Sequence, residues 1–420
     1  MKKIIAFITL IICCFSLFAC QNLQGDIGPQ GPQGEKGDKG DTGADGQTPY
    51  IGENGNWWVG DTDLGVAAQG PKGEPSESSG ASYEGTEGLE FYPLEIQFSN
   101  NSAPTMYYGV MAGTAKYLSN IVIPSQFNNR DILFIFDHAF EGSTFLKTVT
   151  LPQSLGYINS YAFAECGNLS NITFPDTLYI IEDNAFNGCH SLTEIDLSRT
   201  ECGVIGDNAF ENCTNIQKVI LSKSLTIIGD SAFKSCYSLE NIEIPASVEM
   251  IGDSAFSCCS TLESIVFVEG CLPWYIGEYA FNSCYSLKNI ELPASVEIIG
   301  DCAFSDCSSL EKIAIPDKVT SIGFSSFYDC YALEEIKLSS NLETIGGNAF
   351  YNCYALKSIT IPVGVTYIGS DAFYECVSLE EIYFEGTVEQ WNNIMFGDSE
   401  AWFYIPATYV QCSDGIVPLK

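Results

Sequence analysis

The side chains of this 420-residue chain that could do covalent, redox or acid–base chemistry are 18 cysteines, two histidines and 53 carboxylates. Ten of the cysteines recur about every 23 residues and could form either a stack of disulfides or a stack of buried thiols. Stacked strands lie ~4.8 Å apart, which a disulfide can span, but a bridge would break the regular stack. We therefore favour free thiols that pack as small hydrophobic side chains, at Cys166, Cys189, Cys213, Cys236, Cys259, Cys284, Cys307, Cys330, Cys353 and Cys376.

The remaining side chains do not indicate catalysis or metal binding. His138 precedes the first repeat phenylalanine, His190 follows a repeat cysteine, and no two cysteines have the Cys-x-x-Cys spacing of a zinc or redox site. A glycine-rich phosphate loop and a nucleophile elbow are also missing from the sequence. We therefore predict no enzyme activity, no metal site and no cofactor. Five further cysteines follow no regular pattern: Cys202, Cys258, Cys271, Cys302 and Cys412.

The charge of the chain is strongly one-sided, with 53 acidic against 18 basic residues and a formal net charge of -35. This excess disfavours nucleic acids and anionic membranes, because lysine and arginine are what neutralise phosphate. It favours partners with basic patches. The alternative is a solvated acidic surface that has no specific partner.

A repeat of about 23 residues positions these side chains. A phenylalanine marks each unit and follows alanine in all units but one, where Ser326 takes that place. Cysteine comes three residues later, except in the first unit, which has Ser143. Leucine or isoleucine follows at six residues and further apolar residues at nine and eleven. The phenylalanines are Phe140, Phe163, Phe186, Phe210, Phe233, Phe256, Phe281, Phe304, Phe327, Phe350 and Phe373.

This spacing predicts a repeat solenoid. The end of each Leu-x-x-Ile-x-Ile run alternates with period two, which indicates a short strand with one buried face. The proline that often follows, such as Pro245, ends that strand. A second apolar pair, such as Val248 and Ile251, and a Gly-Asp turn then lead to the next Ala-Phe pair. A single unit cannot bury this face, but stacked units can.

The units resemble the leucine-rich repeats of BspA-like bacterial surface proteins, as in NIEIPASVEMIGDSAFSCCSTL at 241–262. The resemblance covers roughly residues 89–415. It implies a curved single-layer array over 133–385, with a β-strand and a turn or short helix in each unit of about 23 residues. It also implies an N-terminal cap over 89–132 that contains a β-hairpin, and a C-terminal cap over 386–420. Both caps would cover open strand edges.

The first residues have the pattern of an export signal. Lys2 and Lys3 precede an apolar run that is too short for a comfortable membrane span of ~20 residues. The run ends in Leu-Phe-Ala-Cys, which resembles a bacterial lipobox. We therefore predict a lipoprotein signal peptide over 1–19, lipidation of Cys20 and a lipidated N-terminus over 20–24; cleavage without lipidation is the alternative.

Glycine occupies every third residue from Gly25 to Gly46, which is a collagen-like pattern. Residues 25–46 could form a homotrimer or remain a single extended stalk. A linker rich in Gly, Pro and Ser follows over 47–88. Its Trp57 and Trp58 could bind a ligand, but a folded motif that caps the stalk is favoured.

Protein binding is the predicted function. The positions seven, eight and ten residues after each phenylalanine should be exposed on the strand face, which repeat proteins present to partners. Tyrosines that follow the repeat cysteines, at 237, 285, 331 and 354, could also contribute. The predicted binding residues are Glu240, Glu243, Glu263, Glu291, Glu311, Glu334, Glu335, Lys337, Glu380, Glu381 and Tyr383.

What the BspA-like resemblance implies is an adhesion or interaction module on the bacterial cell surface, attached to the membrane only through its lipid. It implies host or neighbouring-cell proteins as partners, including matrix proteins such as fibronectin and fibrinogen. A structural role, in which the stalk assembles the arrays into an envelope layer, is the alternative.

Overall fold

The computed structural model describes residues 50–51, 56–59, 62–67, 85–96, 104–397 and 401–419, and gives only the backbone for those below 68. The predicted signal peptide, Cys20 and the collagen-like tract with its trimer lie outside the described residues. The chain divides into two units, Met1–Ala81 and Ser82–Lys420. The domain boundaries drawn from the sequence remain predictions.

The first unit contains a small antiparallel sheet of β1 (Tyr50–Ile51), β2 (Asn56–Val59) and β3 (Thr62–Ala67). Trp57 and Trp58 lie in β2, where their backbone pairs with Ile51 and Tyr50. The folded motif expected around the two tryptophans is therefore present.

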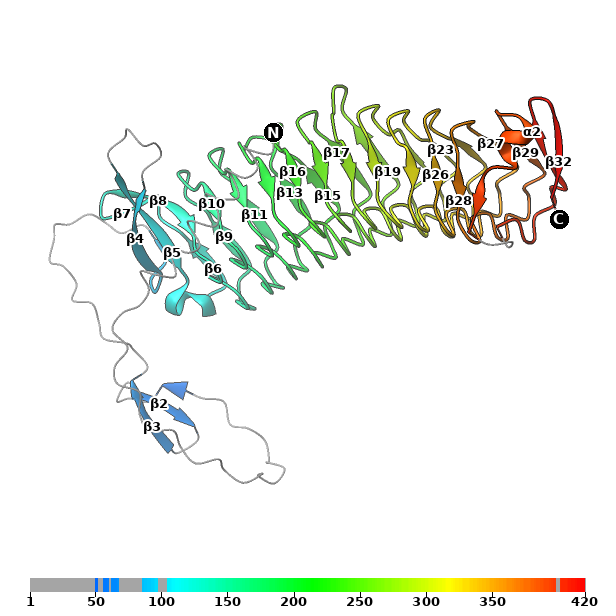
Figure 1. The fold of residues 1–420 in the computed structure, drawn as a ribbon. Helices are drawn as coiled ribbons and strands as arrows, with labels where there is room; N and C mark the ends of the chain where they lie inside the picture. Colours follow the sequence, from blue (N-terminus) through cyan, green and yellow to red (C-terminus); the bar gives the residue numbers. More distant parts are fainter. Residues whose placement is uncertain are drawn as a thin grey trace, which may run out of the picture. The chain divides into compact units, whose positions relative to one another are not determined.

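The second unit is a parallel β-solenoid with one coil per repeat, which confirms the predicted fold class (Figure 1). A first row of strands runs along the array. Equivalent repeat positions face one another in this row, as Ile242 and Ile265 do. The first row consists of β6 (Asn120–Val122), β9 (Thr148–Thr150), β11 (Asn171–Thr173), β13 (Glu194–Asp196), β15 (Lys218–Ile220), β17 (Asn241–Ile244), β19 (Ser264–Phe267), β21 (Asn289–Ile290), β23 (Lys312–Ala314), β25 (Glu335–Lys337), β27 (Ser358–Ile361), β29 (Glu381–Phe384) and β31 (Tyr409–Cys412).

A second row of strands, mostly two residues long, was not predicted, so each coil carries two strands and not one. Each of these strands except the last contains the second residue of the second apolar pair, which points inward, as Ile251 does beside Met250. The second row consists of β8 (Arg130–Ile135), β10 (Tyr157–Ile158), β12 (Ile180–Ile181), β14 (Val204–Ile205), β16 (Ile227–Ile228), β18 (Met250–Ile251), β20 (Tyr275–Ile276), β22 (Ile298–Ile299), β24 (Ser321–Ile322), β26 (Thr344–Ile345), β28 (Tyr367–Ile368) and β30 (Met395–Phe396).

The Ala-Phe stretch of each coil is an extended turn and not a helix. The residues two before and two after the phenylalanine are left-handed in every coil, as Ser231 (φ 55°) and Ser235 (φ 61°) are around Phe233. These turns are hydrogen-bonded along the array in a third ladder, since the N–H of Phe233 donates to the carbonyl of Ala255 over 2.8 Å. The turn edge is therefore as regular as the two strand rows.

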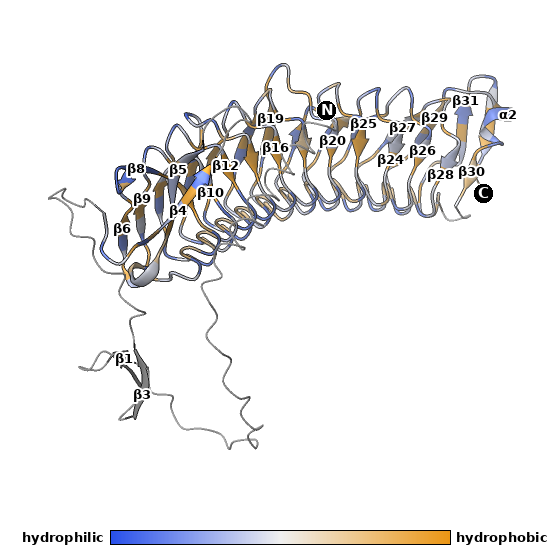
Figure 2. Cartoon of the chain, turned by 60° about the vertical axis from the view of Figure 1, so that its left-hand side comes forward, coloured by the Kyte–Doolittle hydropathy of each residue, from blue (hydrophilic) through white to orange (hydrophobic). Residues whose placement is uncertain are grey.

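One stack of aromatic rings fills the interior. The eleven repeat phenylalanines are fully buried or nearly so, and successive ring centroids lie 5.0 to 5.6 Å apart with nearly parallel planes. Each buried ring contributes ~1.5–3 kcal/mol, and each ring pair adds ~0.5–1.5 kcal/mol. Figure 2 shows the apolar residues of the strands as orange segments on the curved array.

Trp402 ends this stack and makes a twelfth coil that the sequence had not indicated. Its ring lies 4.7 Å from that of Phe373, and the N–H of Phe373 donates to the carbonyl of Ala401, as in the other coils. Ala401 and Trp402 therefore replace the Ala-Phe pair of a regular unit.

Both ends of the array are closed by antiparallel hairpins. At the N-terminal end, β4 (Glu90–Ile96) and β5 (Thr105–Met111) form the β-hairpin that the resemblance implied, followed by η1 (Gly113–Tyr117) and by β7 (Gln126–Phe127) beside β8. At the C-terminal end, β31 pairs with β32 (Gly415–Pro418), and α2 (Val388–Trp391) begins with a capping box at Thr387.

Candidate interaction surfaces

The ten repeat cysteines line the interior and hold their protons. Each is fully buried, and its Sγ lies 3.1 to 3.4 Å from the carbonyl oxygen of a phenylalanine in the preceding coil, as Cys259 does with Phe233. Burial raises the pKa of Cys166 and of Cys376 to about 12. None of the 15 cysteines in the described residues forms a disulfide. These thiols are structural, with no access to a substrate.

The two histidines lie apart on the surface. His138 contacts Glu141 over 2.7 Å and stacks on Tyr161, whereas the His190 ring is 2.8 Å from the carbonyl of Asn212. Within the described residues, no group of three His, Cys, Asp or Glu side chains could hold a metal ion.

The structure exposes every predicted binding residue, either in a strand of the first row or directly next to one. Seven exposed residues, one from each of seven successive coils and seven places after its phenylalanine, form a line that we call the Glu/Lys row. The row runs as follows: Glu240, Glu263, Lys288, Glu311, Glu334, Lys357 and Glu380.

Backbone hydrogen bonds fix the spacing of the Glu/Lys row. The N–H of Glu263 donates to the carbonyl of Glu240 over 2.8 Å, and the N–H of Glu334 donates to that of Glu311 over 2.9 Å. Its two lysines pair with the glutamate of the preceding coil, Lys288 with Glu263 at 3.3 Å and Lys357 with Glu334 at 3.0 Å. Each exposed pair stabilises the fold by only ~0–1 kcal/mol. The row therefore keeps a net negative charge.

The other predicted residues lie on the same strand face, beside this row. Tyr383 donates its hydroxyl to Glu381 over 3.0 Å, and Lys337 pairs in register with Ala314. The structure thus brings the predicted residues onto one face, although they occupy a long strip and not one pocket.

A hollow of about 510 Å³ interrupts this face between β19 and β21. It lies where the unit is lengthened, and β21 pairs with β19 at two positions only. The lengthened loop exposes Leu272 (63%) and Trp274 (43%). Polar and apolar groups line the hollow about equally, and no charged side chain converges on it except Glu269 and Glu291.

A row of aspartates on the turn edge accepts hydrogen bonds from the backbone. The carboxylates of Asp183, Asp207 and Asp230 each accept the backbone N–H of the acidic residue in the next coil, over 2.8 to 2.9 Å. Glycine precedes Asp207 and Asp230, and close approach requires it there, because a Cβ at Gly229 would lie 2.6 Å from the backbone carbon of Gly206. Burial, followed by the charge of its neighbours, raises the pKa of Asp207 and of Asp230. We call this set, with Asp253, the aspartate row.

Two rows of tyrosines occupy the turn edge of the last coils. In one row, Tyr351 stacks between Tyr328 at 5.0 Å and Tyr374 at 4.8 Å. In the other, Tyr331 and Tyr354 stack at 5.1 Å. The next residue along the chain is a carboxylate after Tyr328 and Tyr374 and an asparagine after Tyr351, and Asp306 holds the same repeat position one coil earlier. We call the whole set the tyrosine edge: Tyr328, Tyr331, Tyr351, Tyr354, Tyr374, Asp306, Asp329 and Glu375.

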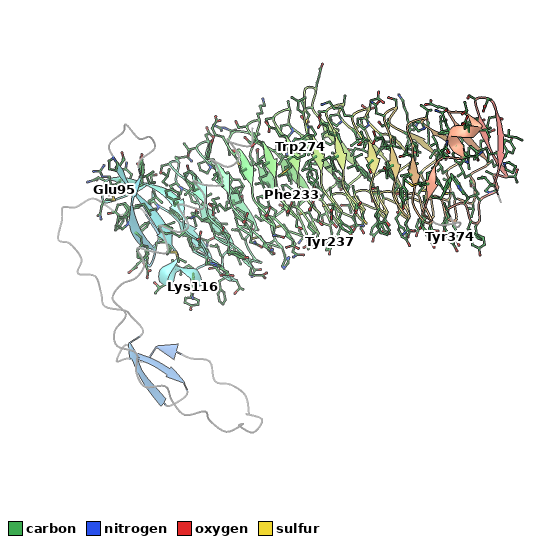
Figure 3. All side chains as sticks on the ribbon, in the orientation of Figure 1. Glu95, Lys116, Phe233, Tyr237, Trp274 and Tyr374 are labelled. Atoms are coloured by element: carbon green, nitrogen blue, oxygen red, sulfur yellow. The ribbon has the colours of Figure 1, made fainter. Side chains whose placement is uncertain are left out.

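Sequence reasoning found Tyr331 and Tyr354 but missed the first tyrosine row. The available signal was the Phe-Tyr pair, which occurs at three successive repeat phenylalanines, 327, 350 and 373, and at no earlier one. Figure 3 shows Tyr237 and Tyr374 along the same lower edge of the array, away from Trp274.

No helix among the described residues is long and apolar enough to cross a membrane.

Comparison with known proteins identifies the repeat. A family model described as the BspA type leucine rich repeat region, six copies, matches residues 111–203, 200–272 and 274–401. No curated protein matches the chain.

Solved structures with a similar fold include a leucine-rich repeat protein from Bacteroides ovatus, 23% identical over 72% of this chain and 97% of that one, with a TM-score of 0.41. A leucine rich cell surface protein from Faecalibacterium prausnitzii is 26% identical over 76% and 99%, with a TM-score of 0.43. The pneumococcal vaccine antigen PcpA is 21% identical over 72% and 81%, with a TM-score of 0.49.

Proposed function

Because the chain belongs to the BspA-type leucine-rich repeat family, we propose that its array is a protein-binding module of an exported, lipid-anchored protein on a bacterial cell surface. Its partners are host or neighbouring-cell proteins with basic surfaces, and matrix proteins such as fibronectin and fibrinogen are the first to test. The first strand row is the binding face.

The Glu/Lys row is the observation that carries this proposal. The interior repeats nearly the same residues from coil to coil, so the fold itself does not require any particular charge outside. The row nevertheless presents five glutamates and two lysines in line on a backbone that is hydrogen-bonded between coils. Fixed, exposed charge steers a partner of opposite charge and sets its register.

A charge-neutralising triple variant tests the proposal. Glu240→Gln, Glu311→Gln and Glu380→Gln remove three charges from the row that have no ion pair with lysine or arginine in the described part of the chain. Binding of the full-length protein to immobilised fibronectin and fibrinogen should weaken by roughly threefold to tenfold at low salt. Surface plasmon resonance measures this change.

The matched control changes the same number of exposed glutamates away from the first strand row: Glu201→Gln, Glu249→Gln and Glu343→Gln. We expect this control to bind as the unmodified protein does. The proposal fails if neither matrix protein binds saturably, or if the control triple weakens binding as much as the row triple.

The lipid anchor has its own test. Cells that express the protein are grown with radiolabelled palmitate, and we expect the label on the protein to disappear with Cys20→Ser. Label that persists in this variant would contradict the anchor without affecting the binding proposal.

A further inference from the structure

The tyrosine edge differs from the rest of the turn edge although the backbone beneath it is the same. The eight earlier coils place Glu141, Ala164, Asn187, Glu211, Lys234, Ser257, Asn282 and Ser305 at the position that holds tyrosine in the last three regular coils. The left-handed residues, the aromatic stack and the buried cysteines continue unchanged through both parts. The fold therefore does not require tyrosine there.

The two tyrosine rows hold carboxylates close to them. Asp329 accepts the hydroxyl of Tyr331 over 2.7 Å and the side-chain amide of Asn352 over 2.7 Å. Oδ1 of Asn352 is buried and has no donor within hydrogen-bond distance, so this part of the edge holds more acceptors than donors. No lysine or arginine in the described part of the chain pairs with Asp306, Asp329 or Glu375.

Burial, a hydrogen bond and neighbouring charge raise pKa values within the edge. Partial burial, and after it the charge of Asp329, raises the pKa of Asp306. The hydrogen bond to Asp329 raises the pKa of Tyr331. A cation beside these carboxylates would offset the part of both pKa shifts that comes from the charge of Asp329.

The stacking decides which kind of ligand fits. Neighbouring tyrosines cover both faces of the Tyr351 ring and one face each of Tyr328, Tyr374, Tyr331 and Tyr354. A sugar that stacks on an aromatic ring needs an open face. An arginine needs carboxylates for its planar guanidinium and an amphipathic surface for its methylenes. Tyr331 is 41% and Tyr354 38% exposed, which leaves such a surface accessible.

We propose that the tyrosine edge is a second interaction surface, which binds an arginine-bearing segment of a partner protein. The guanidinium lies against the carboxylate of Asp329, and its methylene stem packs on the tyrosine rings. This inference goes beyond the proposed function, because it concerns a different surface from the first strand row.

The chain offers a matched pair of variants for the test. Tyr331→Ser with Tyr354→Ser alters the edge, and Tyr237→Ser with Tyr285→Ser alters the same repeat position in coils that lack the neighbouring tyrosine row. Serine stands at this position in other coils, at Ser260 and Ser308, so both pairs should fold. Asp329→Asn is a second variant, supported by Asn352 at the same repeat position.

The probe is a fluorescein-labelled peptide of alternating glycine and arginine, and its binding to the full-length protein is followed by fluorescence anisotropy. We expect the edge pair and Asp329→Asn each to weaken binding by roughly tenfold, and the control pair by less than about twofold. The Glu/Lys row triple should leave peptide binding within about twofold as well.

Three outcomes would overturn the inference. Equal losses in the edge and control pairs would mean that the peptide follows overall charge. Loss only in the Glu/Lys row triple would place arginine binding on the strand face. Binding of a neutral maltooligosaccharide that the edge pair abolishes, without arginine-peptide binding, would make the edge a glycan site. A failure of matrix-protein binding, by contrast, concerns the proposed function alone.

Discussion

The aspartate row and the tyrosine edge lie along the same turn edge and use their carboxylates in opposite ways. Asp207 and Asp230 each accept a backbone N–H from the next coil, so their acceptor capacity serves the fold. Asp329 instead accepts a tyrosine hydroxyl and an asparagine amide from exposed or half-exposed side chains. An acidic row on a repeat protein is therefore informative about binding only after its backbone contacts are known.

Removal of one interior ring should have the largest effect, because both regions depend on the same aromatic stack. Phe256→Ala leaves Phe233 and Phe281 without a stacking partner on one side each. We expect a loss of ~3–5 kcal/mol in stability. Urea denaturation followed by circular dichroism measures it. A loss near that of an exposed substitution, within ~0.5 kcal/mol, would contradict the packed interior.

A pair of substitutions tests the contrast directly. Asp230→Ala removes the acceptor for the N–H of Asp253 and should cost ~1 kcal/mol of stability. Asp329→Asn should change stability by less than ~0.5 kcal/mol. Thermal unfolding of both variants under one buffer provides the measurement. Equal losses would mean that the two carboxylates have the same role.

Thiol labelling tests the closed interior that lies beneath both regions. Because burial holds the pKa of thiols such as Cys166 near 12, the repeat cysteines should resist iodoacetamide at pH 8 in the folded protein. Cys258, which is only half-buried, should react before them. Mass spectrometry of native and urea-unfolded samples counts the labels. Rapid native labelling of Cys213 or Cys236 would refute a closed interior.

The smallest expected effect concerns the charge of the aspartate row. The pKa of Asp207 is raised in the folded protein, so folding favours its protonated form. The stability that the protonated carboxyl contributes is present at low pH and is lost as pH rises through that pKa. Asp207→Asn keeps an acceptor oxygen and removes the charge. At pH 7 we expect a gain of a few tenths of a kcal/mol, which shrinks as pH falls. Urea midpoints compared between pH 7 and pH 4 would show it, and a gain that grows on acidification would contradict the sign.

The sequence was sufficient to predict the coil and its interior, because phenylalanine, cysteine and isoleucine recur at fixed distances. The second strand row escaped prediction because two residues are too few for alternation to be visible. The left-handed positions carry residues as different as Ser231, Glu165 and Tyr279, so no glycine pattern indicated them. Trp402 was missed because tryptophan replaces phenylalanine at a distance longer than one repeat.

The binding surfaces were less predictable. The exposed positions eight and ten residues after each phenylalanine followed from the repeat register, since they flank a buried strand residue, and the Glu/Lys row lies one residue before them. The first tyrosine row could not be derived in that way, because its position is small or polar over most of the array. Its stacking depends on three neighbouring coils having tyrosine together, which is a property of the assembled solenoid.

Because its thiols are buried only in the folded state, the protein should unfold irreversibly in an oxidising medium. Folded, the array keeps its cysteines from molecular oxygen and from disulfide exchange, so its coils need no oxidant to form and no reductant to persist. Once a stretch of coils opens in an oxidising medium, several thiols close together in the chain become available to cross-link in pairings that the native coil cannot accommodate. Unfolded chains would then accumulate in a disulfide-linked form. A protein heated without a reductant would therefore not refold on cooling.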